Sequence, residues 1–240
     1  VDLEIVETEL LLADLETVSK AKLKIERSAK SGDKEAIAQH SRLETIEEEM
    51  NRGILSRNSH FSSENNAYLK DLQLITMKPC IFLANVDEAD NNNDLLKRLE
   101  DYAKNEGVKV LPLCNQIESE VAELDQEERL GILKEMGMNE PGLNRLIRES
   151  YEILNLQTFF TTDTRKLRAW TIKKGSTASQ AAGEIHTDFE KGFIKAETIS
   201  YEDFVKNGGE NGARSAGKLR TEGSDYKVKD GDIIHFVFNV

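Results

Sequence analysis

The feature that most constrains the fold is a pair of short apolar runs with a helical pattern between them. Residues 79–84 (Pro-Cys-Ile-Phe-Leu-Ala) form the first run, and residues 108–113 (Val-Lys-Val-Leu-Pro-Leu) form the second. Runs of this kind are typical of strands that are buried on both faces of a parallel sheet. Residues 94–105 fit a helix with Gly107 at the place of a C-terminal cap. The sequence therefore predicts a right-handed βαβ unit.

Helical patterns surround this unit. Residues 1–52 carry apolar stripes at a spacing of three and four, interrupted by Ser31-Gly32-Asp33, and this predicts an antiparallel helical hairpin. The hairpin is either an arm that binds a protein partner or a solvated structural element. Three further helices are expected, over residues 62–76, 125–136 and 141–154.

The C-terminal part changes character. Strand patterns over residues 167–172 and 194–199 enclose a turn with a cap, Gly175-Ser176-Thr177, and a small-residue helix over 178–186. Residues 226–228 and 233–240 fit strand, tight turn and strand. The pattern favours an α+β domain of the β-grasp type. We therefore divide the chain into a helical arm at 1–62, an α/β domain at 63–164 and a small domain at 165–240.

Charge is distributed unevenly along the chain. The formal net charge is −12 overall, and residues 165–240 hold 13 basic and 11 acidic side chains. The acidic remainder repels phosphate backbones, so we expect RNA contacts only in the C-terminal third. A solvated surface is the alternative. The candidates are Lys173, Lys174, Lys191, Lys195, Lys218 and Arg220.

The composition also excludes several classes of protein. No apolar run approaches the roughly 20 residues of a membrane helix, and the acidic start does not fit a secretory signal. Cys80 and Cys114 are too few for a disulfide framework and lack metal-pair spacing. The spacing of His186, Asp188 and Glu190 favours a helix end over a metal site. A cytoplasmic protein without a metal site in these residues is expected.

The residues after the first predicted strand carry the chemistry. Asn85-Val86-Asp87-Glu88 follows that strand directly, and ligands bind at the carboxyl ends of parallel strands. The amide of Asn85 can pair with the N7 and N6 edge of a purine because it offers both a donor and an acceptor. GTP-binding proteins carry Asn-Lys-x-Asp at such a place, whereas this chain has Val86 and the longer Glu88. The change predicts loss of guanine preference, with tolerance of or preference for adenine; a structural turn is the alternative.

The loop after the second predicted strand is expected to lie beside the base. It consists of Cys114, Asn115 and Gln116, which would offer backbone groups to the nucleotide. A simple βα loop is the alternative. The order and spacing of the two strand ends together favour a nucleotide site.

Longer stretches of the chain resemble the YchF/Obg-like ATPase family of the P-loop GTPase superfamily. The resemblance covers essentially all 240 residues. The stretches that carry it are residues 144–148, 154–161, 168–172, 180–194 and 229–232.

The resemblance implies more than the residue patterns do. It implies a coiled-coil arm inserted in a nucleotide-binding domain of the OBG type, followed by a TGS domain of ubiquitin-like fold. It implies ATP and Mg²⁺ in the intact protein, with Asn85 to Glu88 matching the Asn-x-x-Glu base-recognition motif of the family. Family members are linked to the ribosome, which makes the ribosome or its RNA the expected partner.

One departure from the family pattern is plain. The 240 residues contain no Gly-x-x-x-x-Gly-Lys-Ser/Thr, the loop that binds phosphates. We expect this loop, the Mg²⁺ ligands and the remaining strands of the sheet to lie upstream of Val1, so the chain alone should not hydrolyse ATP. The alternative is a non-catalytic binding module, because TGS domains also occur as regulatory parts of other enzymes.

Overall fold

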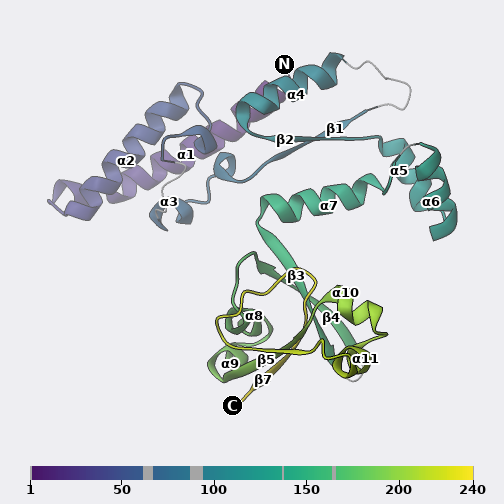
Figure 1. Cartoon of the computed structure of the whole chain (residues 1–240). Coiled ribbons are helices and arrows are strands. Elements are labelled where there is room, and N and C mark those ends of the chain that lie inside the picture. The colour runs from purple at the N-terminus through teal and green to yellow at the C-terminus, as the bar shows by residue number, and fades with distance from the viewer. Residues whose placement is uncertain (1, 62–66, 87–93, 137, 164–165, 240) are drawn as a thin grey trace. The chain divides into compact units, whose positions relative to one another are not determined.

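The computed structural model describes residues 2–61, 67–86, 94–136, 138–163 and 166–239. The chain forms two compact units, residues 1–117 and 118–240. In the first unit (Figure 1) the elements are α1 (Asp2–Lys30), α2 (Lys34–Asn51), η1 (Ser56–Asn58), α3 (Ala67–Asp71), η2 (Ile75–Met77), β1 (Ile81–Asn85), α4 (Asp94–Glu106) and β2 (Lys109–Leu113).

Helix α5 (Asn115–Ala122) crosses the division between the units. The second unit contains α6 (Gln126–Glu135), α7 (Gly142–Ile153), β3 (Leu156–Asp163), β4 (Lys166–Lys173), α8 (Ala178–Ile185), α9 (Thr187–Lys191), β5 (Phe193–Ile199), α10 (Tyr201–Lys206), α11 (Glu210–Ser215), β6 (Arg220–Glu222) and β7 (Ile233–Phe238). None of the helices in these described parts of the chain has the length and apolar character needed to span a membrane.

The predicted helical hairpin is present, as α1 packed along α2 (Figure 1). Asp33 begins α2, and its Oδ1 accepts the backbone N–H groups of Glu35 at 2.9 Å and Ala36 at 3.2 Å. Such a cap satisfies donors that the first helical turn leaves without a partner. The apolar stripes of the two helices meet, which leaves Val18 and Leu43 without exposed surface.

The predicted βαβ unit is also present. Strands β1 and β2 pair in parallel, with Ile81 opposite Lys109 and Asn85 opposite Leu113, and α4 connects them. The prediction that both strands are buried on two faces was wrong for β1, where Leu83 is 49% exposed. The apolar run alone could not reveal this, because α4 packs mainly against β2.

The sheet of the second unit has five strands in the order β4-β3-β7-β5-β6. Strand β3 pairs antiparallel with β4 and parallel with β7, and β5 lies antiparallel between β7 and β6. Helix α8 covers one face and buries Phe159, Ile172 and Ile234 in a common core. The predicted cap before α8 is confirmed, since Thr177 and Gln180 form a reciprocal capping box.

Several local predictions need correction. Residues 226–228 are no strand, and a single bridge from Lys227 to Thr177 is their sheet-like contact. The helix predicted over 62–76 is reduced to α3 and η2 in its described residues. The five-stranded sheet begins at Leu156, so a domain start at 165 separates two strands that pair along their length. Hairpin partners belong to one folding unit, because neither strand satisfies its backbone alone.

The turn between residues 229 and 232 is held to β3 by its acidic side chains. Asp230 Oδ1 accepts the N–H of Thr158 at 2.8 Å, and the Gly231 N–H donates to the Thr158 carbonyl at 2.8 Å. Asp232 is 2% exposed and accepts the Tyr226 hydroxyl at 2.7 Å. Gly231 has a φ of +80°, a conformation that other residues rarely adopt. The Lys-Asp-Gly-Asp sequence therefore has a structural reason.

Candidate functional site

The carboxyl ends of β1 and β2 lie side by side. The Val86 N–H donates to the Leu113 carbonyl at 2.9 Å and extends the parallel pairing by one bond. One residue earlier, Asn85 is exposed at the strand end, and its Oδ1 accepts the backbone N–H of Asn115 at 3.4 Å. The Asn85 side chain thus links the two strand ends at the edge where ligands bind in α/β folds.

The segment after β2 differs from the predicted loop. Helix α5 begins at Asn115, so Asn115 and Gln116 are helical residues and Cys114 is the half-buried connection before them. The first N–H groups of a helix have no partner within it. Asn85 supplies one from the neighbouring strand, which sequence spacing could not have indicated.

The amide of Asn85 retains capacity for a ligand. A side-chain carbonyl oxygen has two lone pairs, and the amide nitrogen has two donor hydrogens. The bond to Asn115 uses one lone pair, so the group can still present an acceptor and a donor together. This is the pattern that the N6 and N7 positions of adenine require. Glu88, the second predicted base contact, lies outside the described residues, as does Asp87.

Three of the six candidate cations are engaged in ion pairs. Lys195 Nζ lies 2.8 Å from Glu197, and Lys218 Nζ lies 3.5 Å from Asp203. Arg220 contacts both Glu222 and Asp232 and lies over the Tyr226 ring. The guanidinium therefore supports the turn around Asp232 and is half-buried there.

The other three cations remain available. Lys173, Lys174 and Lys191 are exposed, and the described part of the chain gives them no ion pair. Lys173 and Lys174 adjoin each other where β4 ends, whereas Lys191 ends α9. The predicted set is thus split by its environment into paired and unpaired members.

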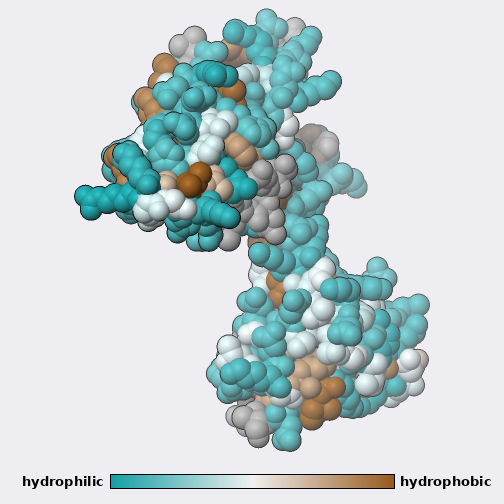
Figure 2. Space-filling view, turned by 90° about the vertical axis from the view of Figure 1, so that its left-hand side faces the viewer, coloured by the Kyte–Doolittle hydropathy of each residue, from teal (hydrophilic) through white to brown (hydrophobic). Residues whose placement is uncertain are grey.

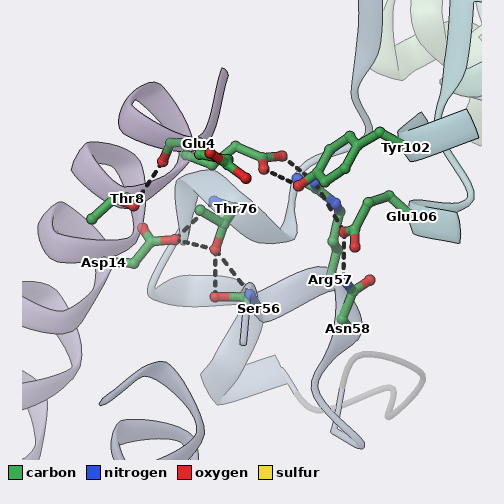
Figure 3. A network of polar contacts seen from close by, with 10 residues as sticks. Glu4, Thr8, Asp14, Ser56, Arg57, Asn58, Thr76, Tyr102 and Glu106 are labelled. Carbon is green, nitrogen blue, oxygen red and sulfur yellow. Dashed lines mark hydrogen bonds and ion pairs between the residues drawn. The ribbon is translucent and has the colours of Figure 1, made fainter. Parts of the chain in front are cut away.

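A polar network at the base of the hairpin joins residues that are far apart in the sequence. Figure 3 shows it between α1, η1, η2 and α4. Asp14 is 2% exposed, and its carboxylate accepts the N–H of Ile75 at 2.7 Å and both the N–H and the hydroxyl of Thr76. The Thr76 hydroxyl also contacts Ser56 Oγ at 2.7 Å. Asp14 lies 61 and 62 residues from Ile75 and Thr76, so no local pattern could have revealed these contacts.

A second part of the same network centres on Arg57. Its guanidinium contacts Glu7 at 2.6 Å and Glu106 at 3.4 Å, and Tyr102 donates its hydroxyl to Glu7. Burial and the Glu7 carboxylate raise the pKa of Tyr102. An adjoining cavity of about 590 Å³ is lined by Glu7, Tyr102 and Glu106 among others. These contacts fix α1 to α4, the helix of the βαβ unit.

Two other groups of residues have structural explanations. His186 accepts the N–H of Asp188 at its Nδ1 and so begins α9, as the pattern of a helix end predicted. Among the residues with described coordinates, no group of three or more His, Cys, Asp or Glu could hold a metal ion. Cys80 and Cys114 are free thiols, and burial raises the pKa of Cys80.

Comparison with known proteins gives consistent relatives. A family model named YchF-GTPase_C, described as a protein of unknown function, matches residues 156–239. The chain is 49% identical over 240 residues to the ribosome-binding ATPase YchF of Escherichia coli O157:H7, and 44% identical over 243 residues to that of Bacillus subtilis. In both cases the whole chain is matched, and it spans 66% of the relative.

Solved structures give the same result for the fold. The YchF GTPase of Schizosaccharomyces pombe matches with a TM-score of 0.83 and 31% identity, over 98% of this chain and 65% of that one. A GTP-binding protein of Pyrococcus horikoshii matches with a TM-score of 0.58 and 22% identity, over 99% of this chain and 71% of that one. The second likeness concerns the fold alone.

Proposed function

The chain belongs to the YchF family, and from that premise we propose that the whole protein is a ribosome-associated ATPase that prefers ATP to GTP. The observation that carries the nucleotide part is the position of Asn85. It stands at the carboxyl end of a parallel strand, bonded to the start of the neighbouring α5. The relatives in bacteria are named ribosome-binding ATPases, which supports the ribosome as partner.

The preference for adenine rests on the residues that follow Asn85. A guanine-specific site needs a carboxylate that accepts the N1 hydrogen and the 2-amine of guanine. Adenine lacks the amine, and its N1 is an acceptor, so a carboxylate facing it meets a lone pair. Val86 in place of Lys and the longer Glu88 in place of Asp change this guanine-specific arrangement, so we infer that the preference for guanine is lost and adenine is accepted or preferred, with Cys114, Asn115 and Gln116 beside the base.

The proposal assigns no phosphate chemistry to this chain. Its 240 residues contain no phosphate-binding loop of the Gly-x-x-x-x-Gly-Lys-Ser/Thr type, and its described residues contain no cluster of metal-ligand side chains. Mg²⁺ neutralises charge on the phosphates in this class of reaction. We therefore propose that the 240-residue chain alone does not hydrolyse ATP, whereas the whole protein does so with Mg²⁺.

The domain assignment is part of the same proposal. Residues 1–62 form the coiled-coil arm, and residues 63 to about 155 form part of the OBG-type domain. The five-stranded sheet from Leu156 onward supports a ubiquitin-like TGS domain. In its order β4-β3-β7-β5-β6, the strands that come first and last along the chain, β3 and β7, pair in parallel, and a helix lies across one face. Lys173, Lys174 and Lys191 remain its candidate contacts to ribosomal RNA. A cytoplasmic location accompanies a ribosomal partner.

The test is a titration of the whole protein, isolated from its own cells, with fluorescent ATP and GTP. We expect ATP to bind at least about tenfold more tightly, a difference of about 1.4 kcal/mol. Asn85→Asp keeps an acceptor for the Asn115 N–H but removes the donor to N7, so it should weaken ATP binding by about tenfold. Asn105→Ala, at an exposed asparagine of α4, is the matched control.

The outcomes separate the competing functions. Equal affinity for ATP and GTP, or an unchanged affinity in Asn85→Asp, contradicts the assignment of the base site. If neither nucleotide binds and no phosphate is released, the protein is a non-catalytic module with a TGS domain. Phosphate release by the 240-residue chain at the rate of the whole protein would contradict the proposal that this chain alone does not hydrolyse ATP.

A further inference from the structure

The helical hairpin has opposite charge at its two ends. Residues 20–34, which contain the turn between α1 and α2, hold six basic and two acidic side chains. Residues 1–19, at the other end of α1, hold six acidic side chains and no basic one. The turn end therefore forms a cationic tip on the acidic N-terminal part of the chain. We call residues 20–34 the arm tip.

Three cations of the arm tip share one face of α1. Lys20, Lys24 and Arg27 follow a spacing of four and three residues, which places them on one face of α1 over about 10 Å of helix. Lys30 and Lys34 lie on either side of the turn. All five are exposed, unlike Lys22, which is held against Glu47 between the two helices. Figure 2 faces the side on which the hairpin turns, and its surface there is mainly hydrophilic.

Three of these five exposed cations have no acidic partner within the described hairpin. The described residues provide no ion pair for Lys24, Arg27 or Lys34. Lys20 contacts Glu16 and Lys30 contacts Glu26, each at 2.5 Å and four residues apart on α1. Exposed pairs of this type contribute little to stability, so Lys20 and Lys30 can exchange these partners for another anion. Five cations are thus accessible to a ligand.

Helix stability explains only part of the arrangement. Arg27 and Lys30 lie in the last turn of α1, where cations favour the helix dipole. Lys34 is the first residue of α2, where the dipole opposes a positive charge. Its position beside the other cations adds like-charge repulsion. An external anion would remove both penalties.

We propose that the arm tip binds the phosphate backbone of RNA, and this rests on the proposed association with the ribosome. The chemistry favours RNA over an acidic protein, because residues 20–37 contain no Trp, Tyr or Phe. Protein interfaces depend on such aromatic anchors, whereas phosphates are bound by exposed Lys and Arg. The tip lies about 40 Å along α1 from its start, at 1.5 Å per residue over 29 residues. A basic end on an extended helical arm can reach phosphates while the acidic body stays away from them.

The test uses three variants of the chain that each reverse three exposed cations. The first carries Lys24→Glu, Arg27→Glu and Lys34→Glu in the arm tip. The others change the candidate cations of the small domain, Lys173, Lys174 and Lys191, or the control cations of α4, Lys97, Arg98 and Lys104, to Glu. All three variants have the same net charge, so a difference between them reports position. Circular dichroism verifies folding of each.

The probe is a dye-labelled RNA duplex of arbitrary sequence, followed by fluorescence anisotropy over a range of salt concentrations. We expect the arm-tip variant to bind at least about tenfold more weakly, with a salt slope smaller by about two to three. The α4 variant should bind like the unchanged chain. Equal weakening in all three variants, or no weakening in the arm-tip variant, overturns the proposal.

Two further measurements separate this inference from others. Polyglutamate is added as a competitor at equal charge; if it displaces the duplex more strongly than unlabelled RNA does, the tip binds acidic protein and the RNA assignment is wrong. Sedimentation of the whole protein with purified ribosomes tests the proposed function itself. Ribosome binding that depends on Lys173, Lys174 and Lys191 alone preserves that function and overturns the role of the arm tip.

Discussion

Replacement of Asp14 gives the sharpest test of the structure. The buried carboxylate accepts three hydrogen bonds that fasten η2 to α1. In Asp14→Ala, the Thr76 hydroxyl can still donate to Ser56, and the N–H of Ile75, a residue 43% exposed, can be hydrated. The Thr76 N–H is buried and keeps no partner. Hydrogen bonds to a charged group contribute about 1.5–3 kcal/mol each, so we expect a loss of about 3 kcal/mol in the free energy of unfolding.

The measurement follows from the placement of the chromophores. The chain has one tryptophan, Trp170, which lies in the second unit, whereas the long helices α1 and α2 belong to the first. Urea unfolding is therefore followed by circular dichroism at 222 nm for the first unit and by tryptophan fluorescence for the second. Asp14→Ala should lower the dichroism midpoint and leave the fluorescence midpoint in place.

The controls determine whether the reasoning holds. Glu9→Ala removes an exposed carboxylate from the same helix and should change the free energy of unfolding by less than about 0.5 kcal/mol. Asp14→Asn keeps one acceptor oxygen and should cost about half as much as Asp14→Ala. A loss below about 1 kcal/mol for Asp14→Ala would refute the idea that this carboxylate holds η2.

Two further predictions concern other parts of the chain. Hydrogen bonds from Lys22 and Ser19 lower the pKa of Glu47. The ionised Glu47 therefore stabilises the hairpin fully at a pH above its usual pKa of 4.5, and this stabilisation is lost as the pH falls through the lowered pKa. Glu47→Gln should therefore flatten the acid limb of a plot of stability against pH, and an unchanged limb would contradict this. At Gly192, an added Cβ would lie 1.9 Å from the Asn239 carbonyl oxygen, so Gly192→Ala must displace backbone. We expect it to lower the free energy of unfolding of the second unit by about 3 kcal/mol and so to move the fluorescence midpoint to a lower urea concentration. An unshifted midpoint would disprove the contact.

Periodicity and turn chemistry predicted the elements that local sequence controls. The hairpin follows from its apolar stripes and the turn residues Ser31-Gly32-Asp33, and α8 follows from the cap at Thr177. The parallel pairing of β1 and β2 follows from two apolar runs with a helix between them. In each case the interactions that decide the structure are close in sequence or depend only on where apolar residues fall along the chain.

The remaining features depend on contacts between distant residues. Helix α5 begins at Asn115, where a loop was predicted, and its first turn is completed by Asn85 thirty residues earlier. Residues 226–228 have strand-like composition, but β5 and β3 occupy both edges of β7, so no edge remains for them. Tertiary competition of this kind overrides local propensity. The role of Glu88 stays a prediction, since this residue lies outside the described part of the chain.

The base and the tip of the hairpin follow different physical rules, and the difference bears on function. At the base, Arg57 joins Glu7 of α1 to Glu106 of α4. These side chains are largely buried, where an unpaired charge would lower the stability of the fold. These contacts fix the direction in which α1 leaves the βαβ unit that carries Asn85. At the tip, Lys24 and Lys34 have no such partners among the described residues. A charge network that fixes one end and leaves cations at the other suits an arm that must hold a defined direction while its far end binds an anion.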